Sequence, residues 1–276
     1  MARKLFCQLS PTTYRISRRK NILLRRLRDL PLLPRLVRAR TSEPLPVVIC
    51  RHNSLIRRRL GQVDMRLQEN KAVNLALAAP KIDGILIRPG EIFSFWRLVG
   101  DCTAQKGFRE GLTISMGQPS SGIGGGLCQL TNLLHWMILH SDLTIIEHHH
   151  HDQIDLFPDY NRQIPFGTGT SICYNYLDYR FRNDTDRTYQ LLVHTTDTHL
   201  RGELRADRPQ ACAYHIDLRY ERFVREQGEV YRCGEIWRRQ VDKRTGNLTG
   251  ETLLRRNHAR VCYDTSHLEI CEEEII

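Results

Sequence analysis

The sequence predicts an α+β fold, in which a helix that carries a cysteine packs on a mainly antiparallel β-sheet. Apolar residues at helical spacing occupy Arg57–Ala79 and the run that ends at Leu139. The second half instead alternates apolar and polar residues in short segments separated by turn residues. A chain of 276 residues is long enough to bury an ordinary hydrophobic core.

The first half contains the predicted helices and one buried strand. One or two amphipathic helices cover Arg57–Ala79, and Pro80 ends them. Ile85–Ile87 reads as a buried strand that enters a turn at Pro89-Gly90. The aromatic residues that follow, Phe93, Phe95 and Trp96, are expected in the core.

A glycine-rich loop, 120–126, leads into an apolar helix that runs to Leu139. The loop lacks the Gly-Lys-Ser or Gly-Lys-Thr ending of a Walker loop and the Gly-x-Gly-x-x-Gly order of a dinucleotide site. A short strand, Leu143–Ile146, then leads directly into four consecutive histidines, His148–His151. The loop therefore predicts a helix N-terminus rather than a nucleotide site.

The second half is predicted to be rich in β-strands. Tyr176–Phe181 and Tyr189–Thr195 are expected to be antiparallel strands joined at 183–186. Further strands are expected around Tyr214–Tyr220, Val230–Trp237 and Ala259–Tyr263, with turns at Gly228 and 245–247.

The positive charge lies in an N-terminal arm. Residues 1–60 contain 16 Lys and Arg against only Asp29 and Glu43, whereas the remainder has 25 basic and 29 acidic residues. We therefore divide the chain into a basic arm (1–60), a main domain (61–207) and a small β-rich appendage (208–276).

The arm mixes leucines with arginines between Ile22 and Val37, and three interpretations are open. The simplest is a solvated basic helix interrupted by Pro31 and Pro34. The second is a segment that lies on an anionic membrane surface. Nucleic acid ranks third, because no nucleic-acid-binding signature accompanies the charge, and no specific nucleic acid is expected.

Nothing in the sequence supports export. No stretch approaches the roughly 20 apolar residues that span a bilayer, and the arm lacks a signal-peptide core. The nine cysteines, an odd number without regular spacing, favour reduced thiols. We expect a cytoplasmic protein, with a peripheral position on the inner membrane face as an option.

Cys128 is the candidate nucleophile. The first turn of a helix stabilises a thiolate through unpaired N–H groups and the helix dipole. The backbone N–H groups of Gly124, Gly125 and Gly126 could also bind an oxyanion in acyl transfer. The alternative is a small buried cysteine, with glycines that serve only the turn.

A cysteine nucleophile usually needs a base. His135 and His140 lie roughly 10 and 18 Å along the same helix from Cys128, which is too far. The His148–His151 run can fold back instead. If it is extended, His149 and His151 point one way and the other two histidines the opposite way, so only one pair can face Cys128.

No cofactor is expected at this site. A metal site is the open alternative, because His149 and His151, with either Cys128 or Asp152, offer three ligands of the types that zinc accepts.

Four short motifs follow one another along the chain: Ile87–Phe95 (IRPGEIFSF), Gly124–Leu130 (GGGLCQL), Ile145–His151 (IIEHHHH) and Leu177–Asp186 (LDYRFRNDTD). Their order is that found in the VanW family, and the sequence resembles that family over about half of its length. The short form, with an arm and an appendage, is similar to accessory members in glycopeptide-resistance gene clusters.

The resemblance implies a cysteine-dependent L,D-transpeptidase, which forms a thioester acyl-enzyme on peptidoglycan stem peptides or their precursors. The family cysteine falls on Cys128, and the family histidines fall on His149 and His151. Gln129, which follows the cysteine in the motif, is expected to contact the substrate together with the three glycines. Glu147 is retained as a supporting residue, and we add Asp178 as another.

One departure favours a different function. Where many family members have an Asp after the histidines, this chain has Gly169, so a carboxylate that could orient the base is missing there. Asp152, Asp155, Asp159 or Asp178 are the possible substitutes. The competing hypothesis is a non-catalytic accessory or binding module at the inner membrane face that contributes to glycopeptide resistance.

Overall fold

The structure is a computed structural model that describes residues 5–58, 64–115, 118–150, 154–156, 158 and 164–272. The mixed α+β class is confirmed, and most strand pairs are antiparallel. The central sheet has the order β1-β10-β9-β2. Its strands are β1 (Val47–Leu55), β10 (His199–Ala206), β9 (Tyr189–Thr195) and β2 (Ile85–Ile87).

The cysteine helix α4 (Cys128–Leu139) packs on this sheet, against β1 and β10, as predicted. Gly202 in β10 makes the close packing possible. A Cβ atom there would lie 2.7 Å from Leu133 Cδ2 and 2.8 Å from Met137 Cε, so the helix side chains occupy the space that a larger residue would need. The sheet therefore fixes the direction of α4 and the position of its first residue.

A second, three-stranded sheet has the order β3-β8-β6 and forms the other wall of the core. Phe93 and Phe181 stack across it, with ring centroids 4.5 Å apart. Its strands are β3 (Ile92–Ser94), β8 (Arg180–Arg182) and β6 (Thr144–Glu147). The short helix α3 (Phe95–Val99) follows β3, and the predicted aromatic core residues are buried.

The predicted pairing of Tyr176–Phe181 with Tyr189–Thr195 is wrong. Both regions contain strands, but β8 pairs with β3 and β6, whereas β9 pairs with β10 and β2. Asn183, between them, bonds instead to the carbonyl groups of Ile87 and Arg187. The connection thus transfers the chain from one sheet to the other.

Helix α2 (Met65–Ala78) holds the glycine-rich loop in place. The Asn74 side chain donates to the carbonyls of Arg109 and Gly125, both at 2.9 Å. Turns η3 (Ala79–Lys81) and η4 (Ala104–Lys106) and the hairpin β4 (Glu110–Ser115) and β5 (Gln118–Ile123) complete this region.

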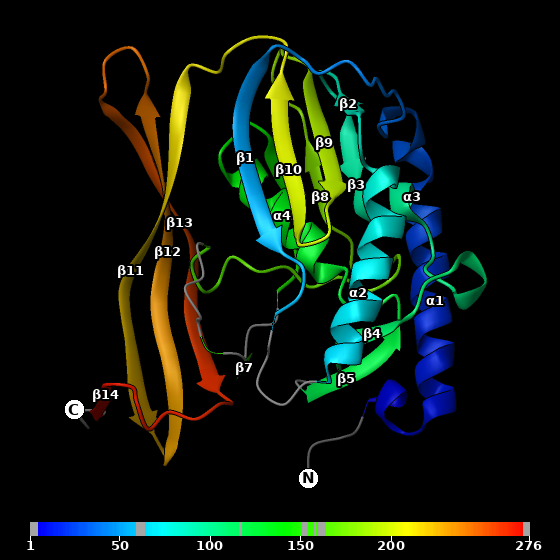
Figure 1. Ribbon diagram of the computed structural model, residues 1–276, viewed down its shortest axis with the longest axis vertical. Helices are drawn as coiled ribbons and strands as arrows, with labels where there is room; N and C mark the ends of the chain where they lie inside the picture. Colours follow the sequence, from blue (N-terminus) through cyan, green and yellow to red (C-terminus); the bar gives the residue numbers. More distant parts are fainter. Residues whose placement is uncertain are drawn as a thin grey trace.

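The segment predicted as an N-terminal arm contributes to the folded core. After η1 (Phe6–Gln8), helix α1 (Pro11–Asp29) begins at the capping residue Ser10 and continues into η2 (Leu30–Arg35). Val37 and Ile56 are buried, and β1 is an edge strand of the central sheet. Figure 1 shows α1 along one side of the molecule.

The C-terminal strands form a separate long sheet on the opposite side of the molecule from α1 (Figure 1). It joins the core where Tyr214 donates to Asp142 at 2.5 Å and Gln210 donates to the carbonyl of His140 at 3.0 Å. Its strands are β14 (Ile270–Glu272), β11 (Cys212–Glu226), β12 (Glu229–Asp242), β13 (Leu248–Val261) and β7 (Ile154–Asp155), in that order.

Candidate functional site

Cys128 is the first residue of α4, as the glycine-rich loop predicted. Burial raises the pKa of its thiol, and a hydrogen bond from the backbone N–H of Ile172 partly offsets that rise. Among the residues that the structure describes, no histidine ring hydrogen-bonds to this thiol. The thiol is therefore held mainly protonated at neutral pH.

The glycines before Cys128 serve close packing. The N–H groups of Gly124 and Gly125 already donate to the carbonyls of Arg109 and Gly122. A Cβ atom on Gly125 would lie 2.2 Å from the carbonyl oxygen of Gly111, so the two backbones meet directly. With these two N–H groups engaged, the predicted oxyanion role is left to Gly126.

Gln129 connects α4 to the edge of the central sheet. Its side-chain nitrogen donates to Ser54 Oγ at 2.8 Å and to the Leu55 carbonyl at 2.9 Å. Its side-chain oxygen is buried and has no hydrogen-bond partner among the residues that the structure describes. The hydrogen bonds to β1 give Gln129 a structural function beside the predicted substrate contact.

The histidine run divides its side chains between two sides, as an extended segment should. His148 Nε2 lies 3.0 Å from the Gly169 carbonyl, and its ring stacks on His135 of α4 at 4.2 Å. His149 points away and bonds to Glu147, at 2.9 Å. His148, rather than His149, therefore faces α4, while His151 and Asp152 lie outside the described residues.

The backbone of residues 168–172 contacts both the histidine run and α4. The Ser171 N–H donates to the carbonyl of His149 at 2.7 Å, and the Thr170 N–H donates to Asn132 Oδ1 of α4 at 2.7 Å. A Cβ atom on Gly169 would lie 3.8 Å from His150 Nε2. An aspartate carboxylate at position 169 would therefore reach the His150 ring. The glycine in this chain cannot provide His150 with that partner.

Glu147, His149 and Asp178 belong to a partly buried ionic cluster. Burial would raise the pKa of Glu147, but hydrogen bonds from Arg25, His149 and the Asp178 N–H outweigh it and hold the pKa low. Asp178 is fully buried and accepts from Ser94 at 2.5 Å and from Arg180 at 2.6 Å. Glu147, His149 and Asp178 thus meet one another and not Cys128.

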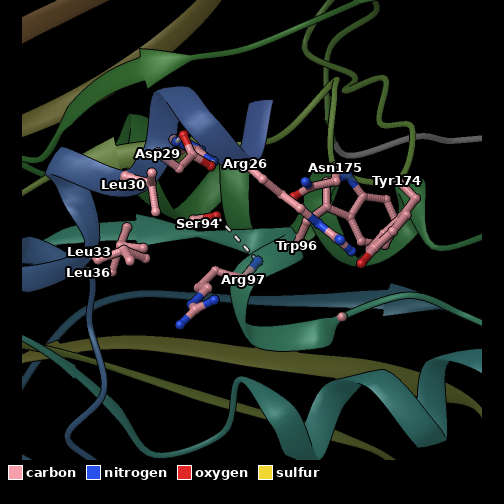
Figure 2. Close-up of a pocket in the computed structure, with 12 residues that line it drawn as sticks. Arg26, Asp29, Leu30, Leu33, Leu36, Ser94, Trp96, Arg97, Tyr174 and Asn175 are labelled. Carbon is pink, nitrogen blue, oxygen red and sulfur yellow. Dashed lines mark hydrogen bonds and ion pairs between the residues drawn. The ribbon is translucent and has the colours of Figure 1, made fainter. Parts of the chain in front are cut away.

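A cavity of about 360 Å³ lies beside this cluster, beneath α1 and η2. Figure 2 shows leucines on one side of the cavity, and Tyr174 and Asn175 on the other. Neither Arg26 nor Arg97, which both line it, forms a salt bridge with a residue that the structure describes. The cavity combines apolar walls with two available cations.

Sequence comparisons identify the family. The family model described as "VanW like protein" matches residues 70–205. The chain is 40% identical over 200 residues to "Vancomycin B-type resistance protein VanW" of Enterococcus faecalis (strain ATCC 700802 / V583), a match that covers 72% of each chain. The chain belongs to the VanW family.

A second comparison covers less of each protein. The chain is 30% identical over 118 residues to "Uncharacterized protein YoaR" of Bacillus subtilis (strain 168), which covers 42% of this chain and 36% of that protein. No solved structure matches the chain. The VanW-type region at 70–205 includes most of α2, all of α4 and the histidine run, whereas α1 and β11–β13 lie outside it.

Lys71, within the VanW-type region, was not singled out from the sequence. Its aliphatic chain fills the space beside Gly126, where a Cβ atom would lie 2.4 Å from Lys71 Cγ. Burial, with smaller effects from Arg58 and Arg57, lowers the pKa of its amine to about 8. The amine donates to Gln68 at 2.7 Å. Only the tertiary structure shows that Lys71 is buried, because a lysine in a helical pattern ordinarily faces solvent.

Metal-ligand atoms converge at another place in this VanW-family chain. Among the described residues, the only group of three such atoms lies in the C-terminal sheet, at Glu226, Cys233 and His258. The alternative predicted site of Cys128, His149 and His151 lies partly outside the described residues. Zinc at that predicted site stays a prediction.

Proposed function

We propose that this VanW-family chain contributes to vancomycin resistance as a non-catalytic accessory protein that binds an anionic membrane surface through α1. The name of its enterococcal relative supports the link with resistance. The observation that carries the membrane part is the orientation of α1, whose apolar side chains point into solvent.

Helix α1 turns its polar face to the protein. Arg25 and Asp29 face inward, where Arg25 pairs with Glu147 and Asp29 with Arg180. No side chain of α1 is fully buried. Four of its large apolar side chains are exposed on the outer side, whereas a surface helix of a globular protein normally turns these toward the core. They are Ile16, Leu23, Leu24 and Leu27.

Basic residues flank this apolar stripe. Ile16, Leu23 and Leu27 recur at spacings of seven and four and so lie on one side of the helix. Arg19, Lys20, Arg26 and Arg28 lie beside them and are exposed. A helix with leucines on one face and cations at its borders fits the interface of an anionic bilayer. No helix in the described part of the chain is long and apolar enough to cross a membrane.

The cavity under α1 and η2 supports a binding function close to the membrane. Arg26 and Arg97 can each hold a carboxylate or phosphate through paired N–H donors. Peptidoglycan precursors and stem peptides carry such groups. We propose this cavity as the place where the protein holds its precursor, with Leu30 and Leu33 as the apolar wall.

Vesicle co-sedimentation tests the membrane part. The full chain should bind phosphatidylglycerol vesicles, and the Leu23→Ser/Leu27→Ser variant should bind at least about tenfold more weakly, because each buried leucine contributes about 1.5–3 kcal/mol. The matched control is Leu248→Ser/Leu254→Ser, which removes two exposed leucines from β13. Equal binding by the two double variants would refute the role of α1.

Cysteine-dependent acyl transfer on stem peptides is the second candidate. It is favoured by the hydrogen bond from the Ile172 N–H to the Cys128 thiol, which stabilises a thiolate at the start of α4. On this hypothesis, Cys128→Ala abolishes turnover of a stem peptide. Gly169→Asp, which adds a carboxylate beside His150, increases turnover. Full activity in Cys128→Ala would exclude it.

A further inference from the structure

A cluster of three ligand-type side chains lies in the C-terminal sheet, outside the region that matches the VanW family model. It consists of Glu226 on β11, Cys233 on β12 and His258 on β13. Their ligand atoms all lie within 4.8 Å of one another. Neither the acyl transfer considered for Cys128 nor the membrane binding proposed for α1 involves these three residues.

The sheet itself brings the three side chains together. Cys233 and His258 are directly opposite in the antiparallel pairing of β12 with β13, so their side chains leave the same face. Glu226 lies at the end of β11, and both of its carboxylate oxygens are 2.9 Å from His258 Nε2. The Tyr231 ring stacks on the His258 ring at 4.5 Å and 12°, which fixes the direction of the imidazole.

We propose that Glu226, Cys233 and His258 form a zinc-binding site. Thiolate, imidazole and carboxylate are the three side-chain ligands that Zn²⁺ accepts, whereas Mg²⁺ and Ca²⁺ prefer oxygen ligands alone. Zinc–ligand bonds of 2.0–2.3 Å place tetrahedral ligands about 3.5 Å apart. A spacing within 4.8 Å therefore needs only small side-chain movements.

The site is open on one side. About half of the His258 side chain is exposed, and Glu226 is partly exposed, so an ion can enter from solvent. Three protein ligands leave a fourth position for water or a small ligand. Metal binding requires a deprotonated thiol and a neutral imidazole, so it releases protons and strengthens as pH rises.

Cobalt titration of the full-length, reduced and chelator-treated protein tests the proposal. Co²⁺ should produce a thiolate-to-metal charge-transfer absorption that Zn²⁺ removes by competition. Cys233→Ser should lose this absorption and one equivalent of zinc. His258→Ala and Glu226→Gln should each weaken zinc binding at least about tenfold, since even outer ligand partners contribute that much. Glu226→Gln changes a partly exposed group and keeps the side-chain shape, so it tests the site without removing its packing.

Two matched control variants test whether Cys233, rather than another cysteine, binds the metal. Cys262→Ser removes an exposed cysteine just after β13 and should leave the absorption unchanged. Cys128→Ser should also leave it unchanged. Loss of the absorption in either control, zinc that persists fully in Cys233→Ser, or no charge-transfer absorption in the unaltered protein would overturn the proposal. The result is independent of vesicle binding, which the outer face of α1 determines.

Discussion

Arg180 of β8 donates two hydrogen bonds to Asp29, the last residue of α1, with N···O distances of 2.8 and 2.5 Å. Arg180 is only 4% exposed and also donates to Asp178, so the end of α1 is attached to a buried ionic cluster. Because charge holds the inner face of the helix, its leucines are left in solvent.

Asp29→Asn should destabilise the protein and loosen α1. Removing one partner of a buried ion pair costs about 3–5 kcal/mol, but Asp178 still neutralises Arg180, so we expect about 1–3 kcal/mol. Urea denaturation measures the loss, and limited proteolysis should cut α1 sooner. Asp184→Asn removes the exposed partner of Arg182 and should cost much less. Equal losses would contradict the anchoring role of Asp29.

Vesicle binding should depend on charge as well as on leucines. Arg19→Glu/Lys20→Glu should weaken binding to anionic vesicles at low salt, because each basic residue contributes about 1 kcal/mol near such a surface. The difference from the unaltered chain should shrink at high salt, where charges are screened. Co-sedimentation at two salt concentrations measures it. A difference that persists unchanged at high salt would argue against an electrostatic contribution.

Cys128 should react slowly with iodoacetamide at neutral pH. Burial raises the pKa of its thiol, whereas Cys262, just after β13, and Cys271, in β14, are exposed. Intact-mass analysis with limiting reagent should show modification of the exposed cysteines first, and Cys128→Ser should leave the fast phase unchanged. Preferential labelling of Cys128 below pH 8 would instead indicate an activated thiolate and favour acyl transfer.

Lys71→Met should stabilise the protein at pH 7. The folded pKa of about 8 lies below the ordinary 10.5, so the unfolded chain retains a proton that the folded chain loses between these values. The contribution of Lys71 to the free energy of unfolding therefore rises as the pH increases from about 8 to 10.5. Below pH 8 the buried amine is charged, and its full destabilising effect applies. Methionine keeps the contact with Gly126 and removes the charge.

The gain should be on the order of 1–3 kcal/mol at pH 7 and should largely disappear above pH 10. Chemical denaturation at several pH values measures it. Lys243→Met, at an exposed position, is the control and should not show this pH dependence. A stability gain that is the same at every pH would mean that packing, rather than the buried charge, is responsible.

Local patterns determined much of the secondary structure. The helix to Leu139 begins at Cys128, and the strand Tyr189–Thr195 has the predicted bounds. The turn at Gly228 also lies where it was predicted, between β11 and β12. Periodicity and turn residues act within a few positions along the chain, so a single sequence is sufficient to reveal them.

Strand pairing needed the tertiary structure. The acidic turn at 183–186 resembles a hairpin loop, but β8 and β9 join different sheets. Strand β1 lies in the predicted basic arm and yet pairs with β10 across some 150 residues. Pairing is decided by which buried faces fit together over long distances, and local spacing does not contain that information.

The sequence by itself determined that Cys128 begins a helix and that alternate histidines face opposite ways, because both follow from local backbone geometry. Only the tertiary structure decided which histidines turn toward α4. The carboxylate of Glu147 holds His149 on one side through a hydrogen bond, while His148 stacks on His135 on the other. The same holds for Glu226, Cys233 and His258, which meet because three strands lie side by side.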